Sequence, residues 1–184
     1  FTALEESLHA NGGRPLSLLW QRGDRELRVD VTPADLHAVT PDAYLEFGGA
    51  VVHELSYQQA RHLNMPPRGI YVATPGYLLS VVGIPRGAVI TELNGTEVAA
   101  LGDFESALAR VADGEPLRIR FLTADVPGRS SLRVVNMSRR WFPERACRRD
   151  DALGYWPCRR LVEGPAPVPP TPATTRFARW GEPR

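Results

Sequence analysis

The hydrophobic pattern of the chain repeats one order of elements twice. In residues 1–31 and again in 104–136, apolar residues three or four apart first predict an amphipathic helix. A glycine-containing turn follows, then an alternating strand that starts at a proline, a second turn and a second strand. The alternating apolar positions are Leu16, Leu18 and Trp20 in the first segment and Leu117, Ile119 and Phe121 in the second. Both second strands contain Leu-Arg-Val, so we interpret the segments as repeats rather than as a chance similarity.

The second repeat has about seventy residues before it that can complete a domain. Alternation over 44–52, interrupted by glycines, and over 69–74 predicts strands. Ser56 can cap a short helix over 57–63. Asn94-Gly95 predicts a hairpin turn, because both central positions of a type I′ turn need positive φ. The first repeat has no such preceding part, so we interpret it as the closing half of a domain whose opening half lies outside this chain.

The pattern Gly-Ile-x-x-Gly-Ala-Val-Ile-x-x-Leu-Asn-Gly-x-x-Val runs from Gly83 to Val98. It resembles the central signature of PDZ domains in HtrA/Deg serine proteases. The following segment, from Asp103 to Val111, is similar to their groove-lining helix, and Asp103 stands where an N-cap would lie.

The run from Asp35 to Val72 resembles one subgroup, the large tandem-protease type with several PDZ modules. Those proteins occur in fungi and some bacteria, with more distant plant relatives. The resemblance continues through Arg139–Phe142 and Leu153–Trp156 and covers roughly residues 1–160. It implies that the chain is a fragment of a longer multidomain protein with a chymotrypsin-like protease domain upstream.

The resemblance implies an α+β fold, in which a PDZ-like, partly open β-barrel or sandwich is capped by two helices and preceded by the C-terminal half of another PDZ module. We expect five parts. They are the preceding half-module at 1–32, a connector at 33–42, the PDZ domain at 43–136, a hairpin extension at 137–161, and a Pro-rich, flexible tail at 162–184.

PDZ domains bind an extended peptide as an added strand and hold its terminal carboxylate with backbone N–H groups of a concave loop. The resemblance places that loop at Tyr44-Leu45-Glu46-Phe47, which leads into Gly48 and Gly49. Phe47 would line the pocket for the last side chain of the peptide, with Phe104 and Leu108 contributed by the helix. Ordinary core packing is the alternative role for these three residues, and a simple bulge is the alternative for the two glycines.

Glu46 conflicts with this expectation, because a carboxylate beside the loop would repel the carboxylate of a ligand. The groove could instead prefer internal segments or a peptide with flanking basic residues, or it could bind nothing. The leading hypothesis is therefore a peptide-binding, regulatory PDZ region of an HtrA-like serine endopeptidase. The alternatives are a non-catalytic scaffold or interdomain packing module and, less well supported, a stand-alone enzyme of unrecognised chemistry.

No serine-nucleophile motif, phosphate-binding loop or zinc-ligand spacing occurs, so we expect no catalytic residue, metal or cofactor in this chain. All 22 basic residues are arginines and the net charge is +1. An arginine cluster over 139–149 contains Trp141 and Phe142, but nearby acidic residues favour a solvated hairpin face or interdomain contact over nucleic acid. No apolar run approaches the ~20 residues of a membrane span.

The expected partners are peptides or unfolded protein segments and the upstream protease domain, with homo-oligomers formed through regions outside this chain. Cys147 and Cys158 fit two free thiols, the simpler interpretation, or a disulfide in an exported protein. The sequence leaves the compartment open; for a bacterial protein the resemblance implies the periplasm or cell envelope.

Overall fold

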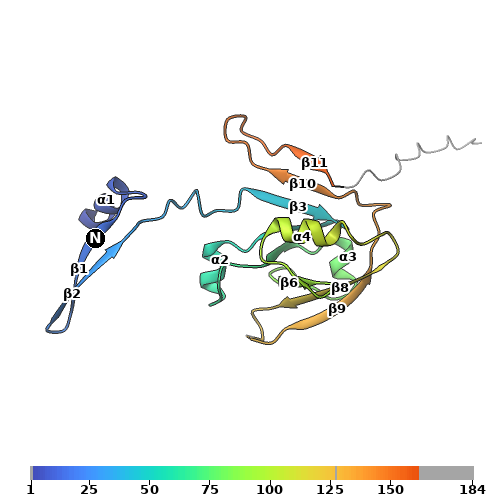
Figure 1. The fold of residues 1–184 in the computed structure, drawn as a ribbon, viewed down its shortest axis with the longest axis horizontal. Helices are drawn as coiled ribbons and strands as arrows, with labels where there is room; N and C mark the ends of the chain where they lie inside the picture. Colours follow the sequence, from blue (N-terminus) through green and yellow to red (C-terminus); the bar gives the residue numbers. More distant parts are fainter. Residues whose placement is uncertain (1, 127, 162–184) are drawn as a thin grey trace, which may run out of the picture.

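The computed structural model describes residues 2–126 and 128–161, and the Pro-rich segment expected at 162–184 lies outside them. One antiparallel sheet holds most of the described strands in the order β11-β10-β3-β4-β5-β6-β8-β9, with β7 beside β6 (Figure 1). Their bounds are β3 (Ala43–Phe47), β4 (Ala50–Glu54), β5 (Ile70–Thr74), β6 (Val89–Leu93), β7 (Thr96–Glu97), β8 (Pro116–Leu122), β9 (Ser131–Asn136), β10 (Arg145–Arg148) and β11 (Cys158–Arg160). The predicted α+β class is confirmed.

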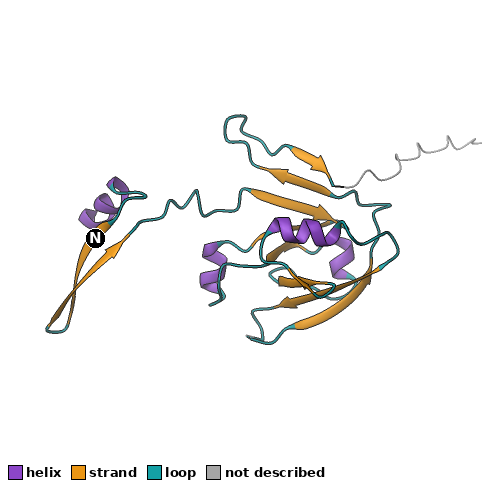
Figure 2. Ribbon diagram, in the orientation of Figure 1, coloured by secondary structure: helices purple, strands orange, loops and turns teal. Residues whose placement is uncertain are grey.

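Three helices accompany this sheet, namely α2 (Tyr57–His62), α3 (Gly76–Ser80) and α4 (Leu101–Leu108) (Figure 2). The predicted cap of α2 is confirmed: the Ser56 hydroxyl accepts from the Gln59 backbone N–H. The expected N-cap of α4 at Asp103 is wrong, because the helix begins two residues earlier. The Asp103 carboxylate instead accepts from the backbone N–H groups of Ala99 and Ala100.

The core lies between α4 and the curled sheet. Phe47 of β3 and Phe104 of α4 are fully buried, and their rings meet edge to face at 5.3 Å. The predicted turn at Asn94-Gly95 is confirmed, since both residues have positive φ and Leu93 pairs with Thr96 around them. The predicted strand over 44–52 is two strands, because Gly48-Gly49 forms the two-residue turn between β3 and β4.

The repeat is confirmed as an order of elements. The first copy forms α1 (Thr2–Ala10), β1 (Leu16–Arg22) and β2 (Arg25–Val31), which correspond to α4, β8 and β9. The strand registers differ by one position, because the second hairpin has the longer turn: Leu18 lies opposite Val29, whereas the equivalent Ile119 lies opposite Arg133.

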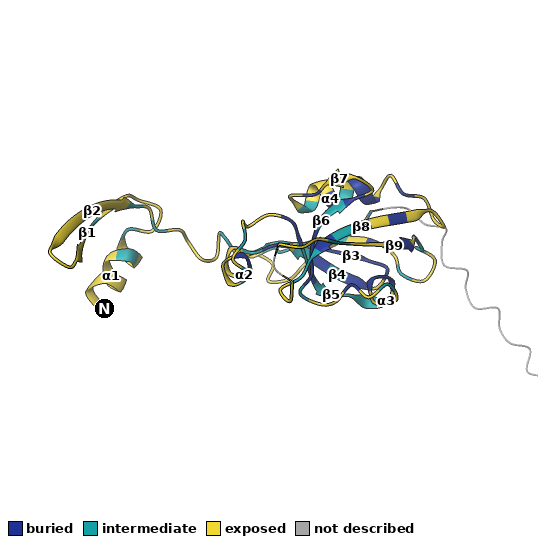
Figure 3. Ribbon diagram, turned by 90° about the horizontal axis from the view of Figure 1, so that it is seen from below, coloured by how far each residue is buried: buried dark blue, intermediate teal, exposed yellow. Residues whose placement is uncertain are grey.

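The two copies differ most in burial. The second contributes Leu117, Ile119 and Phe121 to the core, whereas α1 has no buried residue and Trp20 is 58% exposed. In Figure 3 both strands of the first copy have the colour of exposed residues over most of their length. Its β1–β2 sheet is separate from the main sheet.

Candidate functional site

Strand β3 is paired along both of its edges. On one side it pairs with β4, and on the other with β10, which comes from the extension beyond β9. Strand β10 runs antiparallel to β3, so that Arg145 lies opposite Glu46 and Arg148 lies opposite Ala43. The outer edge of the residues that the resemblance assigned to a carboxylate-binding loop is thus occupied by a segment about a hundred residues further along the chain (Figure 1).

The four residues expected to form a carboxylate-binding loop are strand residues here, and this part of the expectation is corrected. Leu45 and Phe47 are fully buried on the core side, whereas Tyr44 and Glu46 are partly exposed. Alternation in a strand sends neighbouring side chains to opposite faces, which explains this division. Gly48 and Gly49 follow as the β3–β4 turn rather than as a bulge.

The helix residues of the predicted site also lie in the core. Phe104 and Leu108 of α4 are fully buried and belong to the same cluster as Phe47. The structure therefore brings the three residues together as packing partners that connect α4 with β3. A role for them in an open side-chain pocket stays a prediction.

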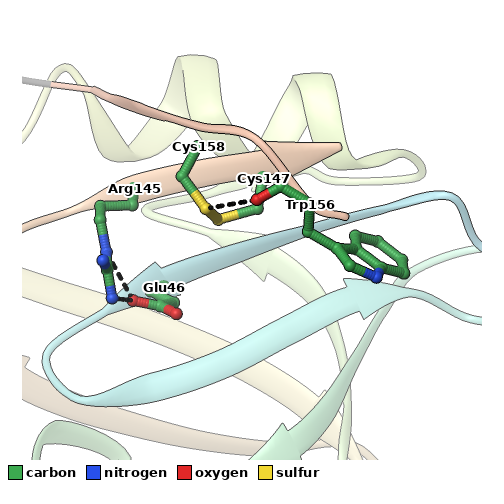
Figure 4. Close-up of a disulfide and its surroundings, with 5 residues drawn as sticks. All are labelled: Glu46, Arg145, Cys147, Trp156 and Cys158. Carbon is green, nitrogen blue, oxygen red and sulfur yellow. Dashed lines mark hydrogen bonds and ion pairs between the residues drawn. A yellow bond between two sulfur atoms is a disulfide. The ribbon is translucent and has the colours of Figure 1, made fainter. Parts of the chain in front are cut away.

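Glu46 has a partner in β10. The Arg145 guanidinium donates from Nε to Glu46 Oε2 at 2.9 Å, and a second nitrogen contacts the same oxygen (Figure 4). A similar pair joins Arg148 to Asp42, directly before β3. Sequence reasoning treated Glu46 as an obstacle to a ligand and missed Asp42, because their partners lie far away along the chain.

Comparison with known proteins identifies the domain. Residues 38–114 match the family of PDZ-like domains. The chain contains a PDZ-like domain. It is 36% identical over 179 residues to Protease Do-like 7 of Arabidopsis thaliana, covering 96% of this chain and 16% of that protein. It is 28% identical over 178 residues to the pro-apoptotic serine protease NMA111 of Pyricularia oryzae, covering 96% of this chain and 17% of that protein.

The homologues of the PDZ-like region are thus Do-like proteases, as the resemblance implied. The chain spans about a sixth of the length of these relatives. Among solved structures, the HtrA-type protease AlgW with decapeptide is similar at a TM-score of 0.43 and 21% identity, over 52% of this chain and 29% of that chain.

A disulfide closes the hairpin that fills the edge of the PDZ-like domain. Cys147 of β10 and Cys158 of β11 lie opposite each other and are bonded, so the interpretation as free thiols is wrong. Trp156 lies just before β11 (Figure 4). Its ring packs against Tyr44 with the ring centroids 5.4 Å apart. Because these contacts join the hairpin to itself and to β3, they hold β10 at the edge.

The segment before β10 is anchored to the PDZ-like domain at two points. The Phe142 ring stacks on Tyr77 of α3 at a centroid distance of 5.9 Å. Arg139 donates to the carbonyl oxygens of Leu108 and Val111 at 3.1 and 2.7 Å, which caps the C-terminal end of α4. Of the two interpretations of the arginine cluster, a solvated face does not apply to Arg139, which contacts the PDZ-like domain.

Arg139 also forms a buried ion pair with Glu144, directly before β10. Its Nε lies 2.9 Å from Glu144 Oε2, and Glu144 is only 3% exposed. Burial raises the pKa of Glu144 above its ordinary value, and the Arg139 guanidinium opposes that rise. Within the described residues, the other oxygen of Glu144 has no hydrogen-bond partner. Within residues 2–126 and 128–161, Arg139 is the cation that pairs with the buried Glu144 carboxylate, so we expect the stability of the fold to depend on it.

A cavity of about 460 Å³ remains between the hairpin and the start of α4. Its charged lining includes Asp42, Glu54 and Glu105 on the domain side and Arg148 and Arg159 on the hairpin side. Arg159 of β11 bridges the space by pairing with Glu105 at 2.7 Å. The hairpin therefore meets the domain across a surface of opposite charge.

The described residues offer no group of three or more histidine, cysteine or acidic side chains arranged to hold a metal ion. Over the same part of the chain, none of the helices is both long and apolar enough to cross a membrane.

Proposed function

We propose that this chain is a regulatory PDZ region of an HtrA-like serine endopeptidase, and that its own strand β10 occupies the strand-addition edge. The observation that carries the proposal is the antiparallel pairing of β10 with β3 over four residues. Strand addition satisfies backbone N–H and C=O groups of a free sheet edge, so an edge that is already paired has no such groups to offer. In this state the region acts as a closed packing module.

Two states of the region correspond to the leading hypothesis and to the scaffold alternative. The closed state corresponds to the scaffold alternative, and the anchors at Phe142, Arg139 and the disulfide support it. Peptide recognition by β-strand addition then requires β10 to leave. Tyr44, Leu45, Glu46 and Phe47 would pair with the incoming peptide in its place.

The proposal also concerns the domain organisation of the chain. We place the half-module at 1–32, the PDZ domain at 43–136 and the edge-filling extension at 137–161. The exposed apolar side chains of β1 and β2 support the half-module, because the equivalent residues of β8 belong to the core. The relatives are several times longer than this chain and are named as proteases, which supports a catalytic domain elsewhere in the protein.

Peptides with a free hydrophobic C-terminus should not bind the oxidised chain. In a calorimetric titration with a valine-ended decapeptide, we expect no measurable heat of binding, because β10 already fills the β3 edge. Hydrogen exchange should show protected backbone amides across Tyr44–Phe47 with or without the peptide. Saturable binding of that peptide to the oxidised chain, with β10 still protected, would contradict the proposal.

A further inference from the structure

We infer that the β3 edge selects an extended internal segment with two basic side chains three residues apart, rather than a free C-terminus. This inference rests on the proposed function, because it concerns the ligand of the same edge. It is carried by the charges that flank β3 and by the segment that the edge already holds.

The domain presents carboxylates at both ends of β3. Asp42 precedes the strand and Glu46 lies within it, and each pairs with an arginine of β10. Further along the same side, Glu105 of α4 pairs with Arg159 of β11. In each of these three pairs the acidic group belongs to the receptor and the arginine to the occupant. Such complementarity of charge fixes register and excludes wrong partners.

The spacing of the arginines fits the spacing of the carboxylates. Arg145 pairs with Glu46 directly across the ladder, and Arg148 reaches Asp42 at the other end of the strand. Between them, Ala146 lies opposite buried Leu45, and Cys147 lies opposite Tyr44, whose ring contacts Trp156. A ligand of this edge therefore needs a basic residue, two small residues and a second basic residue.

A terminal carboxylate is unsuited to this edge. The occupant does not end beside Ala43, because the Arg149 backbone N–H continues the contact by donating to the Asp42 carbonyl oxygen at 2.7 Å. A peptide that ended there would place its carboxylate beside the Asp42 side chain, and like charges at short distance repel. The edge therefore suits a segment that runs through the site.

The test exchanges the charges on the two sides in the full chain. In one variant, R145E with R148E replaces the two arginines of the native β10 by acidic residues, so that β10 is repelled by the unchanged Glu46 and Asp42. In the other, D42R with E46R makes the receptor basic, so that the native β10 is repelled. The probes are two capped peptides with the sequence of residues 143–150 and C147S, one native in charge and one carrying R145E and R148E.

The arginine peptide should bind the first variant about tenfold or more tightly than the acidic peptide does, because each mismatched pair turns attraction into repulsion. The preference should reverse in the second variant, and the unchanged chain should bind neither peptide. A milder pair, R145Q with R148Q, should show the first preference at lower affinity, which keeps the test valid if charge reversal impairs folding.

Three results would overturn the inference. They are equal binding of both peptides, tighter binding of a valine-ended decapeptide without arginines, and a native β10 that stays paired in both reversed variants by hydrogen exchange across Tyr44–Phe47. The proposed function fails differently, through peptide binding by the unchanged oxidised chain.

Discussion

Replacing Gly76 with alanine should lower the free energy of unfolding by about 3–4 kcal/mol. Gly76 is the first residue of α3 and has a φ of +57°. An added Cβ would overlap the backbone carbonyl group of Gly49 in the β3–β4 turn, where neither side has a flexible side chain that could move away. Because β3 leads directly into that turn, the substitution should also weaken the pairing between β3 and β10. Urea denaturation measures the loss.

Gly83→Ala is the matched control. Gly83 has a φ of +72°, but an added Cβ would meet no atom within 4 Å. This variant should lose about 1–2 kcal/mol, the cost of a left-handed conformation alone. Equal losses in the two variants would show that the close approach of α3 to the turn does not matter.

Arg139→Met should remove about 3 kcal/mol of stability at neutral pH, because it leaves the Glu144 carboxylate buried without its cation. It also removes the hydrogen bonds to the last carbonyl groups of α4. Arg140→Met is the matched control, since the Arg140 guanidinium lies over the exposed Trp141 ring. That change should alter stability by less than about 0.5 kcal/mol.

The loss in Arg139→Met should depend on pH. Burial raises the pKa of Glu144 above its ordinary value of 4.5. The folded chain therefore binds this proton more tightly than the unfolded chain does. The stability gained in this way is fully present below pH 4.5 and is lost as the pH rises through the raised pKa. Removal of Arg139 raises that pKa further. Thermal unfolding should thus show a larger loss at pH above neutral than in mild acid. A loss that is constant across this range would contradict the role given to Glu144.

The sequence predicted those features that depend on neighbouring residues. Ser56 capping, the Asn94-Gly95 turn and the repeated helix–hairpin order all follow from short patterns. The resemblance to PDZ domains placed the segment expected to bind peptides on β3. The charge of Glu46 also predicts a conflict with a terminal carboxylate, which stays a prediction.

The occupant of that edge could not be predicted in the same way. Glu46 and Arg145 are separated by 99 positions, and neither has a pattern around it that specifies the other. Strand β10 has only four residues, too few for alternation to identify its partner. The alternation over 44–52 predicts one strand with glycines inside it, so the turn at Gly48-Gly49 is missed, and it is the resemblance that assigns a loop to Tyr44–Phe47.

The hairpin that fills the β3 edge also determines which strand ends the sheet. Among the described strands, the outermost one on that side after β10 is added is β11, which has three residues, Cys158, Arg159 and Arg160. A long, flat and uncharged outer strand invites pairing between molecules, whereas a short strand with charged side chains resists it. Without the extension, β3 would be an edge strand that could pair with another molecule. With the extension, the edge strand is the short and charged β11, which should keep neighbouring copies apart in a crowded solution.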